Sequence, residues 1–145
     1  MLKYTKPERV SLREHPEYDE RWLQQQIAED PSILGLGDLA LLTREVIQPT
    51  RGRLDLLLRG DPSSNQRYEV EIQLGKTDEG HVIRTIEYWD IERKRYPQYD
   101  HTAVIVAEDI TSLDFHGPGK PNMGERFSRG RASRKLRDDV NLLVR

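Results

Sequence analysis

Three carboxylates lie in short segments that are otherwise typical of β-strands. Asp55 lies in RLDLLLR, residues 53–59, while Glu69 and Glu71 lie in YEVEIQLGK, residues 68–76. Carboxylates are depleted in strands because they pack poorly on a half-buried pleated surface. The pattern therefore indicates either a site that uses these groups or a sheet face that is open to water.

A metal site is the chemistry that such a pattern could support. Side chains alternate along a strand, so Glu69, Glu71 and Gln73 are expected on one face, and in a hairpin Asp55 would lie near Glu71. Two adjacent carboxylates raise each other's pKa unless a cation lies between them. Oxygen ligands suit Mg²⁺ or Mn²⁺, with water, a phosphate or the Ile72 carbonyl completing the coordination. The ion would activate water and stabilise charge on a phosphate, as in a phosphodiester hydrolase.

The same spacing also fits a simpler interpretation, in which these side chains form the solvated face of a sheet. An Asp followed by Glu-x-Gln is a weak pattern by itself. For Glu69 we expect solvent exposure rather than a role as a third ligand. His81 is expected to be a surface residue, although it could touch a phosphate or a metal. The surrounding elements must decide between the two interpretations.

The elements around the carboxylates are expected in the order helix, three strands, helix, strand. The predicted helices are 18–31 and 79–96, capped by Asp19 and Asp78, and the predicted strands are 39–47, 53–59, 67–74 and 102–107. This order predicts an α/β fold, a mixed central sheet flanked by helices. Trp22, Ile83 and Trp89 are expected in its core.

The length and composition of the chain exclude several classes of protein. A chain of 145 residues is long enough for one domain with a core. It has no apolar run near the roughly 20 residues that span a bilayer, and no secretory signal, so we expect a soluble, cytoplasmic protein with no membrane partner. Because it has no cysteine, a metal would have to be held by oxygen or imidazole.

The layout resembles the PD-(D/E)xK nuclease superfamily, in particular its RecB- and mismatch-nuclease-type branch, whose restriction-endonuclease-like core has the order αβββαβ. The residues that carry the resemblance are Glu20, Leu23, Ile27, Asp30 and Pro31, then Asp55, then Glu71, Gln73, Gly75 and Lys76, and finally Arg84 and Tyr88. They span roughly residues 19–107. The resemblance implies a Mg²⁺- or Mn²⁺-dependent deoxyribonuclease.

The resemblance also implies roles for the matching residues. Asp55 and Glu71 would hold the metal ion, and Glu20 would bind it through water or orient the site. Gln73 stands where the family has a catalytic lysine. It brings no positive charge, but its amide could orient the attacking water by hydrogen bonds. Tyr88 matches a tyrosine that often faces the site in this family.

DNA is the expected partner, and Lys76 and Arg84 are expected to hold its phosphates. Residues 1–111 would form the nuclease-like domain. Residues 112–145 would form a basic, disordered tail, with eight basic and four acidic residues and room for a short terminal helix. A homodimer stays open. The alternatives are a catalytically inactive nuclease-fold protein that binds nucleic acid or a protein partner, and an ordinary α/β interaction module.

Overall fold

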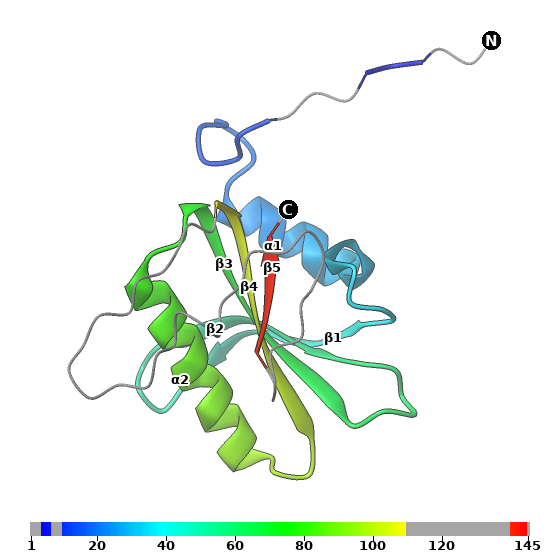
Figure 1. Cartoon of the computed structure of the whole chain (residues 1–145), viewed down its shortest axis with the longest axis vertical. Coiled ribbons are helices and arrows are strands. Elements are labelled where there is room, and N and C mark those ends of the chain that lie inside the picture. The colour runs from blue at the N-terminus through cyan, green and yellow to red at the C-terminus, as the bar shows by residue number, and fades with distance from the viewer. Residues whose placement is uncertain (1–3, 7–9, 110–139, 145) are drawn as a thin grey trace.

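Helices and strands follow one another in the predicted order. The structure, a computed structural model, describes residues 4–6, 10–109 and 140–144. Its elements are α1 (Glu20–Glu29), the 3-10 helix η1 (Pro31–Leu34), β1 (Ala40–Ile47), β2 (Arg53–Arg59), β3 (Gln66–Lys76), α2 (Glu79–Arg95), β4 (Asp100–Asp109) and β5 (Val140–Val144). The strands form one sheet in the order β1-β2-β3-β4-β5 (Figure 1). The first three strands pair antiparallel, and β4 and β5 continue the sheet in parallel, so the predicted mixed α/β sheet is confirmed.

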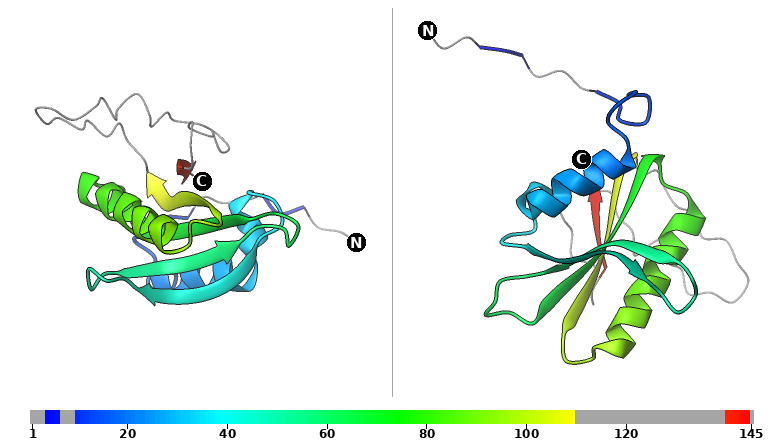
Figure 2. Two further views of the ribbon diagram at one scale, coloured as in Figure 1. Left: turned by 90° about the horizontal axis from the view of Figure 1, so that it is seen from below. Right: turned by 180° about the vertical axis from the view of Figure 1, so that it is seen from behind.

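The two helices cover opposite faces of this sheet (Figure 2). On the α1 face, a buried cluster joins the helical region to the three central strands; it consists of Ile27, Leu34, Leu56, Leu58, Tyr68, Val70, Ile72 and Val104. On the α2 face, Leu54 and Leu57 pack against Tyr88. Each helix thus buries one face against the sheet, α1 mainly over β1, β2 and β3, and α2 mainly over β3 and β4.

Both predicted helix caps are present. Asp19 accepts a hydrogen bond from the Trp22 N–H at 2.8 Å, and Asp78 accepts one from the His81 N–H at 2.8 Å. These bonds satisfy N–H groups that have no partner within the first turn of a helix. The cap at Asp78 begins α2 directly after β3, which places the first turn of the helix beside the end of that strand.

The core predictions for three helical side chains need correction. Ile83 is exposed, because the buried stripe of α2 runs through Val82, Thr85 and Tyr88 instead. Trp22 and Trp89 are only half-buried. The Trp89 indole N–H, for example, donates to a backbone carbonyl at the margin of the sheet. Large amphipathic rings can cover apolar surface there and still keep a polar partner.

Side chains along β2 do not alternate strictly between the two faces of the sheet. Leu54 and Leu57 share the α2 face, although they are three positions apart, while Leu56 lies on the α1 face. Beside this point, β1 contains Glu45 in a left-handed conformation with φ 53. The register between β1 and β2 is regular around Glu45, and it shifts nearer the start of β1, between Leu41 and Thr43.

The end of the described chain is a strand. Residues 140–144 form β5, which pairs parallel to β4, so the short terminal helix that the sequence allowed is not formed there. The division into residues 1–111 and 112–145 stays a prediction, because 110–139 lie outside the described part. Within the described residues, no helix has both the length and the apolar character needed to cross a membrane.

Glu69 is buried rather than exposed, which corrects the solvent-facing prediction. Its side chain on β3 is 0% exposed, and one carboxylate oxygen lies 2.7 Å from His101 Nδ1 on β4. The other imidazole nitrogen lies 2.9 Å from the Tyr96 carbonyl. Burial raises the pKa of Glu69, and the hydrogen bond from His101 opposes that rise. The parallel pairing of β3 with β4 creates this contact, since it places the two side chains on the same covered face.

Removing one member of this pair should destabilise the fold strongly. We expect His101→Leu to lower the free energy of unfolding by about 3–5 kcal/mol, because Glu69 would be left buried without its partner. The double variant Glu69→Leu/His101→Leu should recover much of this loss, since neither polar group remains. Urea denaturation of the three proteins measures both effects. A single variant as stable as the wild type would show that the pair contributes little.

Candidate active site

Strands β2 and β3 separate at the predicted carboxylates. Their backbone pairing runs from Arg59–Arg67 to Leu56–Val70 and ends there. Beyond it, each acidic side chain accepts a backbone N–H of the other strand. The Asp55 N–H donates to Glu71 Oε1 at 3.2 Å, and the Ile72 N–H donates to Asp55 Oδ2 at 2.8 Å. The structure therefore brings Asp55 and Glu71 together, with side chains replacing the missing backbone bonds.

Both carboxyls of this pair resist ionisation. Burial and then the charge of Asp55 raise the pKa of Glu71 to about 8. Burial also raises the pKa of Asp55, although the hydrogen bond from Ile72 works in the opposite direction. Near neutral pH the two groups therefore carry less negative charge than two free carboxylates. A bound cation would reverse this, since it favours the ionised form of both.

Glu20 approaches the same place from the first turn of α1. It is exposed, and its Oε1 accepts the Leu74 N–H at 3.0 Å. Its charge contributes to the raised pKa of both Asp55 and Glu71. Glu20 and Asp55 line an open polar cleft of ≈ 630 Å³, whose other lining residues are Arg13, Asp19, Arg21, Gln24, Glu45, Arg53, Ile72 and Leu74.

Gln73 lies on β3, and its side chain reaches Asp78, the cap residue of α2. Its Nε2 donates to Asp78 Oδ2 at 3.3 Å, and its Oε1 is buried without a hydrogen-bond partner among the described residues. A buried acceptor without a donor is costly, so a water molecule is a natural partner for this oxygen. The hydrogen bond to Asp78 thus holds the amide nitrogen of Gln73, and the amide oxygen can still accept a hydrogen bond.

His81 and Arg84 bring an imidazole and a positive charge to the pair. His81 Nε2 lies 3.9 Å from Glu71 Oε2, and Arg84 Nη2 lies 2.7 Å from His81 Nδ1. Burial, and then the charge of Arg84, lower the pKa of His81. The guanidinium also favours the ionised forms of Asp55 and Glu71. His81 was expected at the surface; only the Asp78 cap, which fixes the first turn of α2 beside β3, hinted at this position.

The two remaining predicted residues, Lys76 and Tyr88, do not line the cleft that contains Asp55. Lys76 is exposed and lines a separate cavity rather than the cleft that contains Asp55. Tyr88 is buried in the core beneath the site. Its hydroxyl approaches Gly52 so closely that a Cβ there would lie only 1.9 Å from the Tyr88 oxygen. Tyr88 is therefore a packing residue that supports β2, and Gly52 leaves the space that it needs.

The donor set fits a hard divalent cation that keeps most of its water. Within the described ranges, no three acidic, imidazole or thiol side chains are grouped closely enough to hold an ion. Asp55 and Glu71 alone supply carboxylate oxygens from two strands. Mg²⁺ is commonly bound by one or two carboxylates, with water and substrate phosphates as the other ligands. Burial and the charge of Asp55 raise the pKa of Glu71, and a divalent cation bound there would favour its ionised form.

Two solved structures share this fold. EndoMS in the complex EndoMS-dsDNA2 has a TM-score of 0.57 and 20% identity, over 77% of this chain and 42% of that chain. A repair endonuclease from Pyrococcus abyssi has a TM-score of 0.54 and 21% identity, over 68% of this chain and 41% of that one. This chain thus covers about two fifths of each of them. No family model and no curated protein matches the sequence.

These similarities define the class of the fold. It is α/β with the restriction-endonuclease-like αβββαβ core, the fold that the family resemblance implied. Sequence identity of 20–21% shows the fold alone. The activity of this chain must therefore be argued from its own side chains.

The raised pKa of Glu71 should make stability depend on pH. This carboxyl has an ordinary pKa of 4.5 and a folded-state pKa of about 8. Its contribution to stability is therefore complete below pH 4.5 and is lost as the pH rises through about 8. We expect the free energy of unfolding, measured in urea, to decrease over that range.

The matched variant is Glu71→Gln, which keeps an oxygen for the Asp55 N–H but cannot ionise. Its free energy of unfolding should vary much less with pH than that of the wild type. Asp55 and Glu69 titrate in both proteins, so the difference between the two curves reports Glu71. Parallel curves would show that the pKa of Glu71 is close to its ordinary value.

Proposed function

We propose that this protein is a Mg²⁺- or Mn²⁺-dependent deoxyribonuclease of the PD-(D/E)xK class, with Gln73 in the position of the usual lysine. The observation that carries the proposal is the Asp55–Glu71 pair at the point where β2 and β3 separate. The two carboxylates accept backbone N–H groups, but burial works against their negative charge, which a bound cation would offset. Perturbed groups of this kind, beside a cleft, are typical of functional sites.

Asp55 and Glu71 would hold the ion, with the Ile72 carbonyl within reach as a further oxygen. When bound, the metal would lower the pKa of a coordinated water and stabilise negative charge on the scissile phosphate. Glu20 would contact the ion through water, or orient the site through its hydrogen bond with the Leu74 N–H. These roles agree with what the family resemblance implies for the same residues.

Gln73 and Arg84 would together supply the two functions of the lysine that Gln73 replaces, which are orienting water and providing positive charge. The unpartnered Oε1 of Gln73 can accept a hydrogen bond from the attacking water and so orient it. Arg84 supplies positive charge through its contact with His81, which in turn lies beside Glu71. A guanidinium in this place favours negative charge that develops on a phosphate. Lys76, further from the pair, would contact DNA phosphates only.

DNA is the substrate that the comparisons favour. One similar structure is EndoMS in a dsDNA complex, and the other is a repair endonuclease. The shared fold therefore accommodates duplex DNA in at least one protein. Because this chain spans only about two fifths of each, the DNA structure that it cuts and its assembly as a homodimer stay proposals. The cytoplasmic location expected from the sequence is likewise a prediction.

One observation favours the alternative, a nuclease-fold protein that binds DNA without cutting it. Gln73 is already hydrogen-bonded to Asp78, and it cannot supply the positive charge of a lysine. A site of this kind could keep its metal ion and its DNA while the hydrolytic step is lost. Cleavage assays separate the two functions directly.

The first assay follows cleavage of single-stranded, duplex and branched DNA with Mg²⁺ or Mn²⁺. We expect wild-type protein to cut at least one of them, and Asp55→Ala to abolish cleavage because the ion loses a ligand. Glu71→Gln should lower the rate by about a hundredfold or more. Glu87→Gln, which removes an exposed carboxylate of α2, is the matched control and should leave the rate unchanged. Equal rates in all four proteins would place the activity outside this pair.

The second assay tests Gln73. Gln73→Ala should lower the cleavage rate without weakening metal binding, since the water loses an orienting partner while Asp55 and Glu71 remain. Gln73→Lys should retain or raise the rate. If only Gln73→Lys cuts DNA, the wild-type chain is a binding protein derived from a nuclease. If neither protein cuts or binds DNA, the carboxylates form an ordinary polar surface.

A further inference from the structure

The segment that precedes α1 is bound to the C-terminal end of β4, through the side chain of Glu108. We call residues 11–13 the strap. Oε1 of Glu108 on β4 accepts the backbone N–H groups of Leu12 and Arg13, the latter at 3.2 Å, and the Ser11 hydroxyl at 3.4 Å. Its Oε2 accepts the Gly75 N–H at 2.7 Å. Although burial works against its charge, these backbone N–H groups hold the pKa of Glu108 below its ordinary value.

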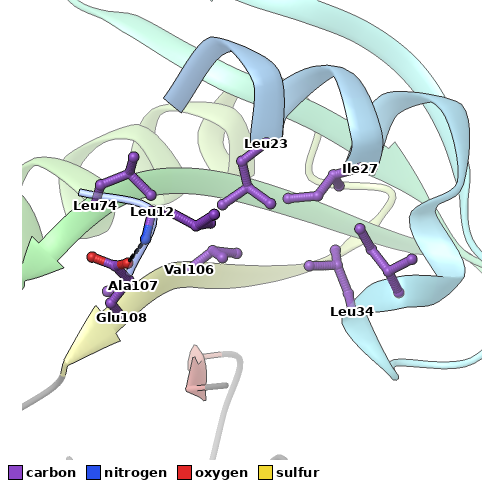
Figure 3. A pocket seen from close by; sticks show the side chains of 9 residues that line it. Leu12, Leu23, Ile27, Leu34, Leu74, Val106, Ala107 and Glu108 are labelled. Atoms are coloured by element: carbon purple, nitrogen blue, oxygen red, sulfur yellow. Dashed lines mark hydrogen bonds between the residues drawn. The ribbon is translucent and has the colours of Figure 1, made fainter. Parts of the chain in front are cut away.

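Apolar packing holds the strap as well. Leu12 closes a cavity of ≈ 200 Å³ between α1 and the sheet (Figure 3). The other residues that line it are Leu23, Ile27, Ile33, Leu34, Leu74, Val106, Ala107 and Glu108. One carboxylate and one leucine therefore fix the backbone just before Arg13.

Arg13 lies over the irregular end of β3. Gly75 has φ +77, and a Cβ built on it would lie 2.7 Å from Arg13 Cδ. Glycine is thus required twice, for the left-handed backbone and for the space that the arginine occupies. The Arg13 side chain lines the cleft that contains Glu20 and Asp55, and also the neighbouring cavity that Lys76 lines.

The charge of Arg13 is not used within the described parts of the chain. No acidic side chain there forms a salt bridge with it, whereas Arg53, in the same cleft, lies 3.5 Å from Glu45. The cleft itself is rich in carboxylates, which repel a polyanion. A nucleic acid therefore needs fixed cations at the rim of the cleft.

We propose that Arg13 binds a backbone phosphate of the DNA strand that enters the Asp55 cleft, and that Glu108 is the positioning residue that holds Arg13 there. The inference rests on the proposed function and extends it to a residue outside the predicted site. A guanidinium can grip a phosphate with two parallel hydrogen bonds. Fixing its backbone beforehand reduces the entropy that binding must remove.

The test measures binding of labelled single-stranded and duplex oligonucleotides in EDTA, so that no cleavage occurs. Arg13→Gln should weaken binding about three- to tenfold and reduce the slope of log K against log salt by about one. Arg13→Lys should recover part of the affinity. Lys94→Gln is the control, because Lys94 pairs with Asp90 in the last turn of α2, roughly 20 Å along the helix from His81.

The variant Glu108→Gln tests whether Glu108 acts on DNA binding by positioning Arg13 or only through its negative charge. Removing a negative charge should by itself strengthen DNA binding. If Glu108 positions Arg13, the variant binds more weakly, because an amide has only one acceptor oxygen for both Gly75 and the strap. The double variant Arg13→Gln/Glu108→Gln should then bind no more weakly than Arg13→Gln alone. Thermal unfolding of each variant establishes that it is folded.

Each outcome separates the two proposals. If the wild type binds DNA and Arg13→Gln binds equally well with an unchanged salt slope, the role of Arg13 is wrong and the proposed nuclease stands. If Glu108→Gln binds more tightly than the wild type, the positioning role is wrong. If the wild type neither binds nor cuts DNA, the proposed function fails, and the role of Arg13 fails with it.

Discussion

The separation of β2 from β3 is the constraint around which this structure is arranged. At that point two N–H groups lose their partners in the neighbouring strand, and the carboxylates of Asp55 and Glu71 accept them instead. Those bonds satisfy the backbone, but they also fix two acidic groups next to each other in a buried place. Burial and the charge of Asp55 raise the pKa of Glu71 to about 8, so it is unfavourable for both carboxyls to be ionised. A cation is the simplest group that would offset their charge.

Strand β3 shows how different surroundings give neighbouring acidic residues different roles. Glu69 is completely buried and is neutralised by His101, so it belongs to the core. Glu71, two positions further, faces Asp55 and the first turn of α2. Both share one face of β3, as alternation requires. The partner that each one meets, and not its residue type, separates a structural carboxylate from a candidate ligand.

Unusual backbone conformations lie on both sides of the site. Glu45 has φ 53 in the strand beside Asp55, and Gly75 has φ 77 at the end of β3. The first lies opposite β2, and the second makes room for Arg13. Non-glycine residues in left-handed conformations are uncommon and persist only where the surroundings enforce them. Here Glu45 itself and Arg13, which packs on Gly75, both line the cleft.

Much of the fold could be predicted from the sequence because its signals are local. The helix caps Asp19 and Asp78, the turns and the strand periods set the order of elements, and a hairpin suffices to bring Asp55 near Glu71. The burial of Glu69 could not be predicted in this way. It depends on His101, 32 residues away on a parallel strand, which no local pattern places opposite it.

The positions of the basic side chains around the site were likewise decided by tertiary structure. Arg13 reaches the cleft only because Glu108, 95 residues further along the chain, binds its backbone. His81 meets Glu71 because the cap at Asp78 starts α2 beside the end of β3. Sequence periodicity determines which residues share a face of one element. Contacts between elements arise instead from packing and strand register. The sequence by itself therefore determined the helices, the strands and the Asp55–Glu71 pair. Only the tertiary structure decided which side chains those carboxylates and their neighbours contact.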